Sequence, residues 1–298
     1  MKKSILVVGP ALSRSGYGEQ TRFALRALRA HEDLFDVYII PTVWGATGWI
    51  TDVSEERFWI DERIRLTQER NMKELGYHAS IQIDIPWAPP PAGSPPGTQP
   101  SGWRPLTDYD IGYTAGIETN KISPQWIEKS QIMKKIIVVS EHSKNVFNDT
   151  VYTAVDQKTG RQMHISNKTP IEVVGFPYRN IETTDPLNLN LKHDFNFLSV
   201  SQWCRRKNLE NTIAWFTEAF HDKPVGLVLK ANLMKNCLMD RTRTAAFIGN
   251  ILSNFPERKC SVHLLHGELS ESEMQTLYTE PKIKAYLSLS HGEGFGIP

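Results

Sequence analysis

A carboxylate set among glycines is the pattern in this sequence best suited to chemistry. Glu293 lies in the segment His291-Gly-Glu-Gly-Phe-Gly-Ile-Pro298, which follows the apolar run Tyr286–Ser290. The alternation in that run predicts a strand, and Pro298 stands where the first turn of a helix is expected. Ligands of open α/β sheets bind beyond the carboxyl ends of the strands, where glycines let backbone N–H groups approach them. The segment is therefore either a ligand-binding loop that carries Glu293 or an ordinary tight turn.

A run of three cations marks a second place suited to chemistry. Arg205, Arg206 and Lys207 follow the predicted strand Phe195–Val200, and apolar residues at helical spacing come after them, with Asn208 placed to cap the helix. The exposed N–H groups and the dipole at the start of a helix favour anions, and neighbouring cations add to that attraction. The run predicts a site for a phosphate-bearing ligand, with a solvated basic turn as the alternative.

Two glycines follow the first predicted strand. Ser4–Gly9 is typical of a buried parallel strand, a loop over 10–18 carries Gly16 and Gly18, and helical spacing begins at Glu19. The glycines permit close approach of a phosphate to the helix, although the segment lacks the G-x-G-x-x-G spacing of dinucleotide-binding loops. A plain turn between strand and helix is the alternative.

Other polar side chains stand where predicted strands end. Glu118 follows a strand over 110–114, and His142 follows a strand over 135–140. Because the carboxyl ends of parallel strands meet at one edge of a sheet, these side chains are candidates for the same ligand-binding edge. Taken alone, each could equally be a cap or a surface residue.

Predicted strands and helices alternate along the chain, which indicates an α/β fold with mainly parallel sheets. The length of 298 residues suffices for two domains, and an aperiodic polar stretch predicts their boundary, which divides the chain into 1–183 and 184–298. The stretch 86–105 is dense in proline, glycine and serine, which predicts a solvent-exposed insertion, and we expect that residues 88–104 can be removed with little effect on folding. Residues 151–170 predict a hairpin. The other predicted elements are strands over 36–41, 80–85, 171–175, 225–230 and 261–266 and helices over 19–31, 61–76, 124–133, 141–147 and 240–252, with Gly76 as a helix cap.

The composition excludes several classes of protein. The 34 Lys and Arg residues balance 33 Asp and Glu. The chain therefore lacks the basic surplus that would indicate nucleic-acid binding. The apolar run near the N-terminus is too short for a signal peptide or a membrane span. His263 and His266 fall on opposite faces of a strand, so they predict no metal site, and we expect no required metal. The three cysteines lack paired spacing, which favours a reducing cytoplasm: Cys204, Cys237 and Cys260.

The segment Ser290–Pro298 resembles the nucleotide-sugar motif of retaining GT-B glycosyltransferases of the family 4, or group 1, type. The strings GYTAGIET and KIIVVSEHSKNVF within 111–147 resemble the same family, and the resemblance spans nearly the whole chain. It implies two Rossmann-like domains, the C-terminal one incomplete, and transfer of a sugar from a nucleotide-diphosphate sugar to an acceptor with retention at the anomeric carbon. The family motif has two glutamates. Glu293 matches the first and the second would fall beyond Pro298, so we expect weak donor binding and no transfer from the 298-residue form.

The resemblance also implies roles for single residues. Glu293 would orient the donor sugar or ribose, while Glu118 or His142 would contact the acceptor hydroxyl or the transferred sugar. Lys207 matches a lysine that holds the donor diphosphate, whereas the family's arginine position is occupied by Gln202. The catalytic candidates are Glu293, Glu118 and His142, and the donor-binding candidates are Gly16, Gly18, Arg205, Lys207, Leu269, Gly294, Phe295 and Gly296. No cofactor is implied beyond the donor, and the acceptor is left open among polysaccharide, lipid, protein and modified nucleic acid.

Two alternatives belong to other functional classes. One is a catalytically inactive nucleotide-sugar-binding fragment, which a glutamate eight positions after Glu293 in the coding sequence would argue against. The other is a nucleotide-dependent oxidoreductase built on the loop with Gly16 and Gly18, which binding of NAD(P)H would reveal.

Overall fold

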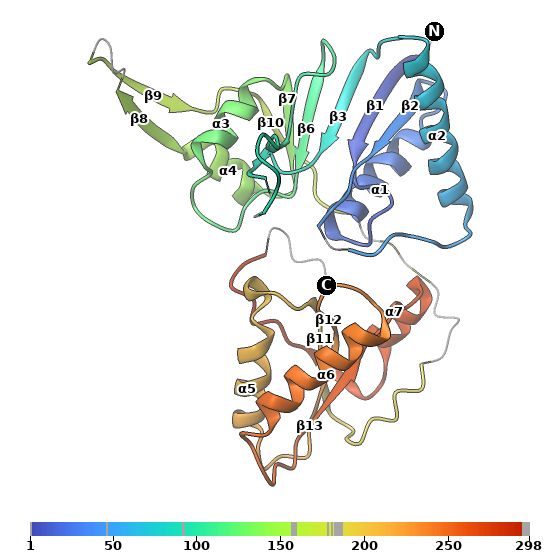
Figure 1. Ribbon diagram of the computed structural model, residues 1–298, viewed down its shortest axis with the longest axis vertical. Helices are drawn as coiled ribbons and strands as arrows, with labels where there is room; N and C mark the ends of the chain where they lie inside the picture. Colours follow the sequence, from blue (N-terminus) through green and yellow to red (C-terminus); the bar gives the residue numbers. More distant parts are fainter. Residues whose placement is uncertain are drawn as a thin grey trace. The chain divides into compact units, whose positions relative to one another are not determined.

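The computed structural model describes residues 2–45, 47–90, 93–155, 160–177, 179, 181 and 187–293 (Figure 1). The chain forms two compact units, of which the first runs to Pro177 and the second begins at residue 178. The predicted boundary between residues 183 and 184 lies outside the described residues. Each unit is an α/β structure around a parallel sheet, as the alternation of strands and helices predicts.

The sheet of the first unit has six parallel strands in the order β10-β7-β6-β3-β1-β2. Their bounds are β1 (Lys3–Gly9), β2 (Phe35–Pro41), β3 (Ala79–Ile83), β6 (Asp110–Thr114), β7 (Lys135–Val138) and β10 (Ile171–Val173). The chain adds β2 on one side of β1 and every later strand of this sheet on the other. The direction of winding therefore reverses between β1 and β3, and such a reversal opens a crevice at the carboxyl ends of the two strands.

Serine side chains begin the helices of the first unit. These helices are α1 (Gly16–Arg29), α2 (Glu55–Met72), α3 (Pro124–Gln131) and α4 (Glu141–Asp149). In α1 the hydroxyl of Ser15 accepts the N–H of Gly18, so the helix starts three residues earlier than its apolar spacing predicts. In α2 the predicted Gly76 cap is wrong, because the left-handed residue after the helix is Glu74, with φ of 54°.

The predicted insertion 86–105 is anchored to the core through Trp103, although residues 95–101 are exposed as predicted. It pairs β4 (Trp87–Ala88) with β5 (Ser101–Gly102), and Trp103 is only 1% exposed. The Trp103 ring lies over Gly112, where a Cβ would come within 2.5 Å of it. Trp126 of α3 donates its indole N–H to the carbonyl of Trp87 at 2.9 Å. This packing argues against the prediction that residues 88–104 can be removed, because Trp103 fixes the stretch to the sheet.

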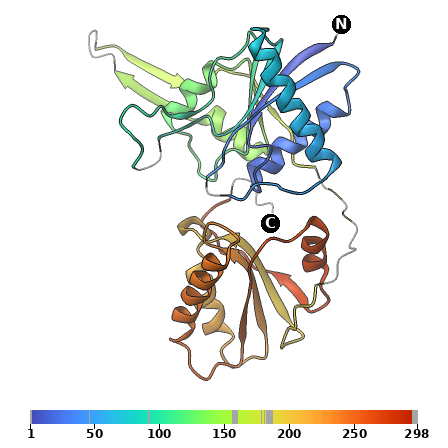
Figure 2. The ribbon, with the colours of Figure 1, turned by 45° about the vertical axis from the view of Figure 1, so that its right-hand side comes forward.

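The predicted hairpin is confirmed. β8 (Val151–Val155) and β9 (Gln162–Ser166) form an antiparallel pair, and the connecting residues 156–159 lie outside the described ranges. In both ribbon views the hairpin projects away from the sheet of the first unit (Figures 1 and 2).

The second unit has four parallel strands in the order β13-β12-β11-β14. Its elements are β11 (Asn196–Gln202), α5 (Leu209–Ala219), β12 (Gly226–Asn232), α6 (Leu238–Leu252), β13 (Ser261–Leu265), α7 (Glu271–Thr279) and β14 (Ile283–Tyr286). Alternate residues of β12 enter two different clusters, as a strand covered on both faces requires. Leu227 and Leu229 pack with α5 and α6, whereas Val228 packs with Leu277 of α7.

The last strand differs from the sequence prediction. β14 ends at Tyr286, where the predicted strand begins, although the N–H of Leu287 still donates to the carbonyl of Leu198 at 2.8 Å. The chain then leaves the sheet, and the segment from Ser290 to Glu293 is free to turn toward the loop that follows β11. Among the described helices, none combines the length and hydrophobicity that crossing a membrane requires.

Candidate functional site

The structure brings Glu293 to the cations that follow β11. These cations form a short 3₁₀ turn, Arg205–Lys207, between β11 and α5. Lys207 Nζ lies 2.6 Å from Glu293 Oε1, and Arg206 Nη1 lies 2.9 Å from Glu293 Oε2. Arg206 also donates to the carbonyl of Gly292 at 2.6 Å. Two segments more than eighty residues apart therefore meet at the carboxyl edge of the second sheet, in a cluster of two cations and one carboxylate.

The cluster keeps Glu293 ionised. Burial alone raises the pKa of its carboxyl, but the hydrogen bonds from Lys207 and Arg206 outweigh burial, and the net effect is a pKa below its ordinary value. The side chains of Glu293 and Lys207 are 27% and 22% exposed, so a ligand can reach both.

Asn208 connects the two segments but does not cap α5 as predicted. It occupies the position before the helix with a left-handed φ of 53°, and its side chain makes no capping hydrogen bond. Its Nδ2 donates to the carbonyl of Leu289 at 3.0 Å, and its Oδ1 accepts from Asn211 at 2.7 Å. Asparagine tolerates the left-handed conformation, which ends the 3₁₀ turn and starts the helix at one residue. Asn208 thus holds the chain just ahead of Glu293.

Arg206 takes the place that the donor-binding set gives to Arg205. Arg205 is exposed, and within the described residues its side chain has no partner. The spacing of three consecutive cations does not distinguish them, because only the turn decides which side chain faces Glu293. Leu269, the candidate beside the nucleotide base, is half-buried and packs into the cluster that contains Leu277 and Val228.

A buried, hydrogen-bonded pair of Asp240 and His266, which sequence analysis missed, supports this edge of the sheet. Asp240, in the first turn of α6, accepts the backbone N–H of Leu233, Met234 and Lys235 at 2.8–2.9 Å. Its Oδ1 also lies 2.9 Å from His266 Nε2. These bonds lower the Asp240 pKa although burial opposes them. The pair ties the loop after β12 to the loop after β13. In the sequence, only the position of Asp240 in the first turn of a helix pointed to such a contact.

In the first unit, the loops at the carboxyl edge of the sheet are joined by contacts of Tyr17, not by the neighbouring glycines Gly16 and Gly18. Tyr17 Oη lies 2.8 Å from Thr114 Oγ1 and accepts the N–H of Ala115 at 3.2 Å. Its ring stacks on Trp44 with centroids 4.1 Å apart. Burial raises the Tyr17 pKa, the bonds to Thr114 and Ala115 lower it, and the charges of Asp84 and Glu118 raise it, with a net increase. Tyr17 therefore joins the loops that follow β1, β2 and β6 at one edge.

The two glycines of α1 differ in role. A Cβ on Gly18 would lie 2.0 Å from the carbonyl oxygen of Ser13, so this position requires glycine for packing alone. A Cβ on Gly16 would meet nothing within 4 Å, and Gly16 is exposed. Only Gly16 is free to approach a ligand.

Glu118 lies on the loop that follows β6, and His142 lies in the first turn of α4, which follows the adjacent strand β7; both are exposed. In the same loop as Glu118, Gly116 has a φ of 87° and lies so close to Ser143 of α4 that a Cβ would come within 2.0 Å of the Ser143 Oγ. The loop after β6 therefore packs against the start of α4, and Glu118 and His142 both stand at the carboxyl edge of the first sheet. The donor-binding candidates Gly294, Phe295 and Gly296 lie outside the described residues.

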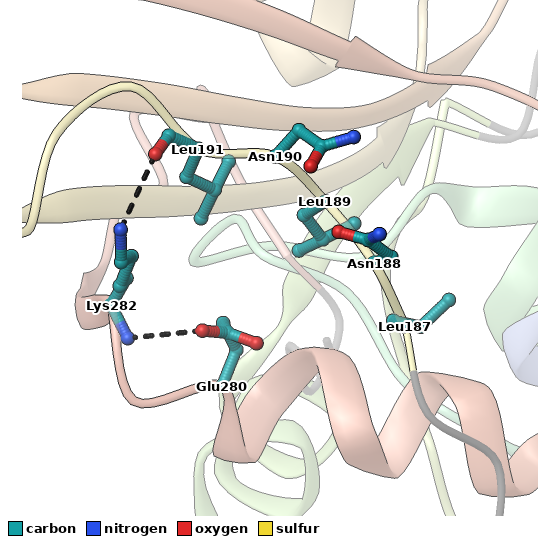
Figure 3. A pocket seen from close by; sticks show the side chains of 7 residues that line it. All are labelled: Leu187, Asn188, Leu189, Asn190, Leu191, Glu280 and Lys282. Carbon is teal, nitrogen blue, oxygen red and sulfur yellow. Dashed lines mark hydrogen bonds between the residues drawn. The ribbon is translucent and has the colours of Figure 1, made fainter.

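A separate hollow of about 450 Å³ lies in the second unit, where the segment Leu187–Leu191 passes beside Glu280 and Lys282 (Figure 3). Lys282 Nζ donates to the carbonyl of Leu191 at 3.5 Å, and the Lys282 N–H donates to Glu280 at 3.3 Å. None of the predicted site residues that the structure describes lines this hollow. Across the described ranges, no three His, Cys, Asp or Glu side chains gather in a way that could hold a metal ion.

Comparison with known proteins extends the description of the fold. No protein-family model and no curated protein matches the sequence. An Escherichia coli trehalose-6-phosphate structure bound with UDP-2-fluoro glucose is 11% identical with a TM-score of 0.51, over 98% of this chain and 79% of that one. A structure of OtsA without ligand is 11% identical with a TM-score of 0.52 over the same shares. The likeness shows that the chain has the fold of GT-B glycosyltransferases, built from two Rossmann-like domains, and the fold that the sequence motifs imply is confirmed.

Proposed function

We propose that this protein is a glycosyltransferase that moves a sugar from a nucleotide-diphosphate sugar to an acceptor, with retention of the anomeric configuration. The observation that carries the proposal is the cluster of Arg206, Lys207 and Glu293 at the carboxyl edge of the second sheet. Cations with a carboxylate suit a donor that has both phosphates and sugar hydroxyls. The shared fold supports the same reaction class.

In this mechanism the second unit stabilises the departing diphosphate. Negative charge develops on the phosphate oxygens as the bond to the sugar breaks, and Lys207 and Arg206 offer charge-assisted hydrogen bonds to it. No metal is required for this step. Glu293, which is ionised, accepts hydrogen bonds from hydroxyls of the donor sugar or ribose and so orients the donor. In this proposal Leu269 lies beside the nucleotide base, and the other donor-binding residues are Gly294, Phe295 and Gly296.

In the free protein Glu293 occupies the cations that the diphosphate requires. Donor binding therefore exchanges carboxylate oxygens for phosphate oxygens at Arg206 and Lys207. The same exchange releases a Glu293 oxygen for a sugar hydroxyl, so phosphate binding and sugar orientation are coupled through one side chain.

The first unit supplies the acceptor side in this proposal. Glu118 and His142 stand exposed at the ends of adjacent strands, where they contact the acceptor hydroxyl or the transferred sugar. Gly16 offers a backbone approach to the donor phosphate. The three cysteines are unpaired, which is consistent with work in the cytoplasm.

Replacement of Lys207 by alanine tests the proposal. Loss of one charge-assisted contact is expected to weaken binding of UDP, GDP or ADP, whichever the wild type binds, by about 10- to 100-fold, or roughly 1.5–3 kcal/mol. The measurement is isothermal titration calorimetry with each nucleotide. Lys223→Ala, an exposed lysine just before β12 at the opposite edge of the sheet, is the matched control and is expected to bind as the wild type does. Equal affinity in the wild type and the Lys207 variant would overturn the donor-site assignment.

A further inference from the structure

A hollow of about 910 Å³ is lined by residues of the first unit, and none of the described candidate site residues is among them. Its floor is made by Val8 of β1 and by Ile83 and Asp84 at the end of β3, with Thr42–Gly45 after β2 on one side. The segment Pro100–Arg104 of the insertion forms another wall, together with Lys129 of α3.

The position of this hollow follows from the topology. The strand order reverses between β1 and β3, and the loops after these strands diverge to opposite faces of the sheet. In open α/β sheets this divergence opens a crevice at the carboxyl ends of the two strands, where ligands bind. The hollow lies at that crevice, because residues from the ends of both strands line it.

Two side chains in the walls suit a sugar ligand. One is the Trp44 indole, which is held in place, and the other is the Asp84 carboxylate, which can accept a further hydrogen bond. Tyr17 stacks on Trp44 and holds it, while the Trp44 side chain stays half-exposed in the hollow. One carboxylate oxygen of Asp84 accepts the N–H of Ile85 at 2.7 Å, and across the described residues the other has no partner. Asp84 is half-buried, and burial raises its pKa to about 6. A carboxylate in this position gains by accepting a hydrogen bond from a ligand.

The geometry points to a pyranose ring as the ligand, held with its C–H face against Trp44 and a hydroxyl donating to Asp84, so that the acceptor of the transfer reaction presents a sugar. An indole face matches the apolar side of a sugar ring, and a carboxylate matches its hydroxyls. A lipid chain would leave the half-buried charge of Asp84 unsatisfied, whereas sugar hydroxyls can donate to Asp84 and accept from Arg104 and Lys129, which also line the hollow. This inference rests on the proposed function and names its acceptor class.

The insertion 86–105 gives this crevice its shape. Trp103 fixes the segment to the core over Gly112, and Arg104 is held through its backbone, which exchanges two hydrogen bonds with the buried Gln82 at 2.7 and 3.0 Å. The wall at Pro100–Arg104 is therefore rigid and is expected to select which sugar enters.

Saturation-transfer NMR tests the inference on the 298-residue chain, with the methyl α-glycosides of glucose, galactose and mannose as probes. At least one glycoside is expected to receive saturation through its ring protons. Trp44→Ala and Asp84→Asn are each expected to weaken its binding at least tenfold. The exposed Gln99→Ala in the same insertion is the matched control and is expected to bind as the wild type does.

Two further measurements test the donor site and the sugar pocket independently of each other. Lys207→Ala is expected to keep its affinity for the glycoside, and Asp84→Asn is expected to keep its affinity for the nucleotide. No binding of any glycoside, or equal binding by wild type and Asp84→Asn, would overturn the sugar pocket whatever happens at Lys207. If Trp44→Ala fails to fold, the result for Asp84→Asn alone tests the inference. This variant is expected to fold, because it removes a half-buried charge.

Discussion

At the scale of single residues, Glu293 pairs with Arg206 and Lys207, the two cations that we propose bind the donor. Replacing it by glutamine removes the competing charge while keeping the size of the side chain. We expect Glu293→Gln to bind UDP, GDP or ADP about 2- to 5-fold more tightly, since ion pairs near the surface contribute up to about 1 kcal/mol. Transfer is expected to fall sharply, because an amide orients sugar hydroxyls less well than a carboxylate.

Calorimetry and turnover with the cognate donor, in a chain that transfers, check this pair of effects. The informative outcome is their opposite sign. A variant that lost nucleotide affinity and turnover together would show that Glu293 binds the donor directly without competing for Lys207.

Asp84 gives a residue-scale prediction about stability and pH. Burial raises its pKa from 3.8 to about 6, so the folded state binds the proton more tightly than the unfolded state does. Its cost to folding is absent below pH 3.8, grows as the pH rises to about 6 and is constant above that. We expect Asp84→Asn to raise the free energy of unfolding of the first unit by roughly 1–2 kcal/mol at pH 7.5, with a much smaller gain at pH 4.5.

Urea titrations of both proteins at the two pH values measure this difference. A gain of the same size at pH 4.5 and pH 7.5 would contradict the assignment, because it would not come from the titration of Asp84.

At the scale of elements, the insertion 86–105 is an anchored part of the first unit. Trp103 is nearly fully buried over Gly112, so Trp103→Ala leaves a large cavity and is expected to cost about 3–5 kcal/mol of stability. Deletion of 88–104 is expected to unfold the first unit for the same reason. Thermal unfolding of Trp103→Ala beside the exposed control Gln99→Ala measures the effect, and a loss below about 1 kcal/mol would mean that the wall is not anchored there.

At the scale of the whole molecule, the two units have separate apolar cores. The clusters around Leu25 and Phe147 belong to the first unit, and those around Phe216 and Leu277 belong to the second. Residues that share an apolar core unfold together. Because each unit has its own core, we expect two unfolding transitions in a calorimetric scan. A nucleotide at about 100 times its Kd is expected to raise only the transition of the second unit, by the equivalent of about 2.7 kcal/mol.

Trp103→Ala assigns the two transitions, since it is expected to lower only that of the first unit. A single transition that moves with both the nucleotide and the variant would show that the units unfold together.

Much of the fold follows from the sequence alone. The continuous apolar run of β12 and the helical spacing within α5 are local patterns, and they survive folding because each element must bury one face or both. The pairing of a lysine at 207 with a carboxylate at 293 was also within reach, because both follow strands of one parallel sheet and so share an edge.

Only the tertiary structure decided the rest. Composition hides Trp103, because two tryptophans among many prolines and glycines barely change the average, yet burial of Trp103 converts a predicted loop into the wall of a pocket. The choice of Arg206 over Arg205 depends on the rotation of a single 3₁₀ turn, and the contact of Asp240 with His266 depends on how two loops fold back. Periodicity reports which face of an element is buried, whereas these contacts depend on which distant group reaches that face.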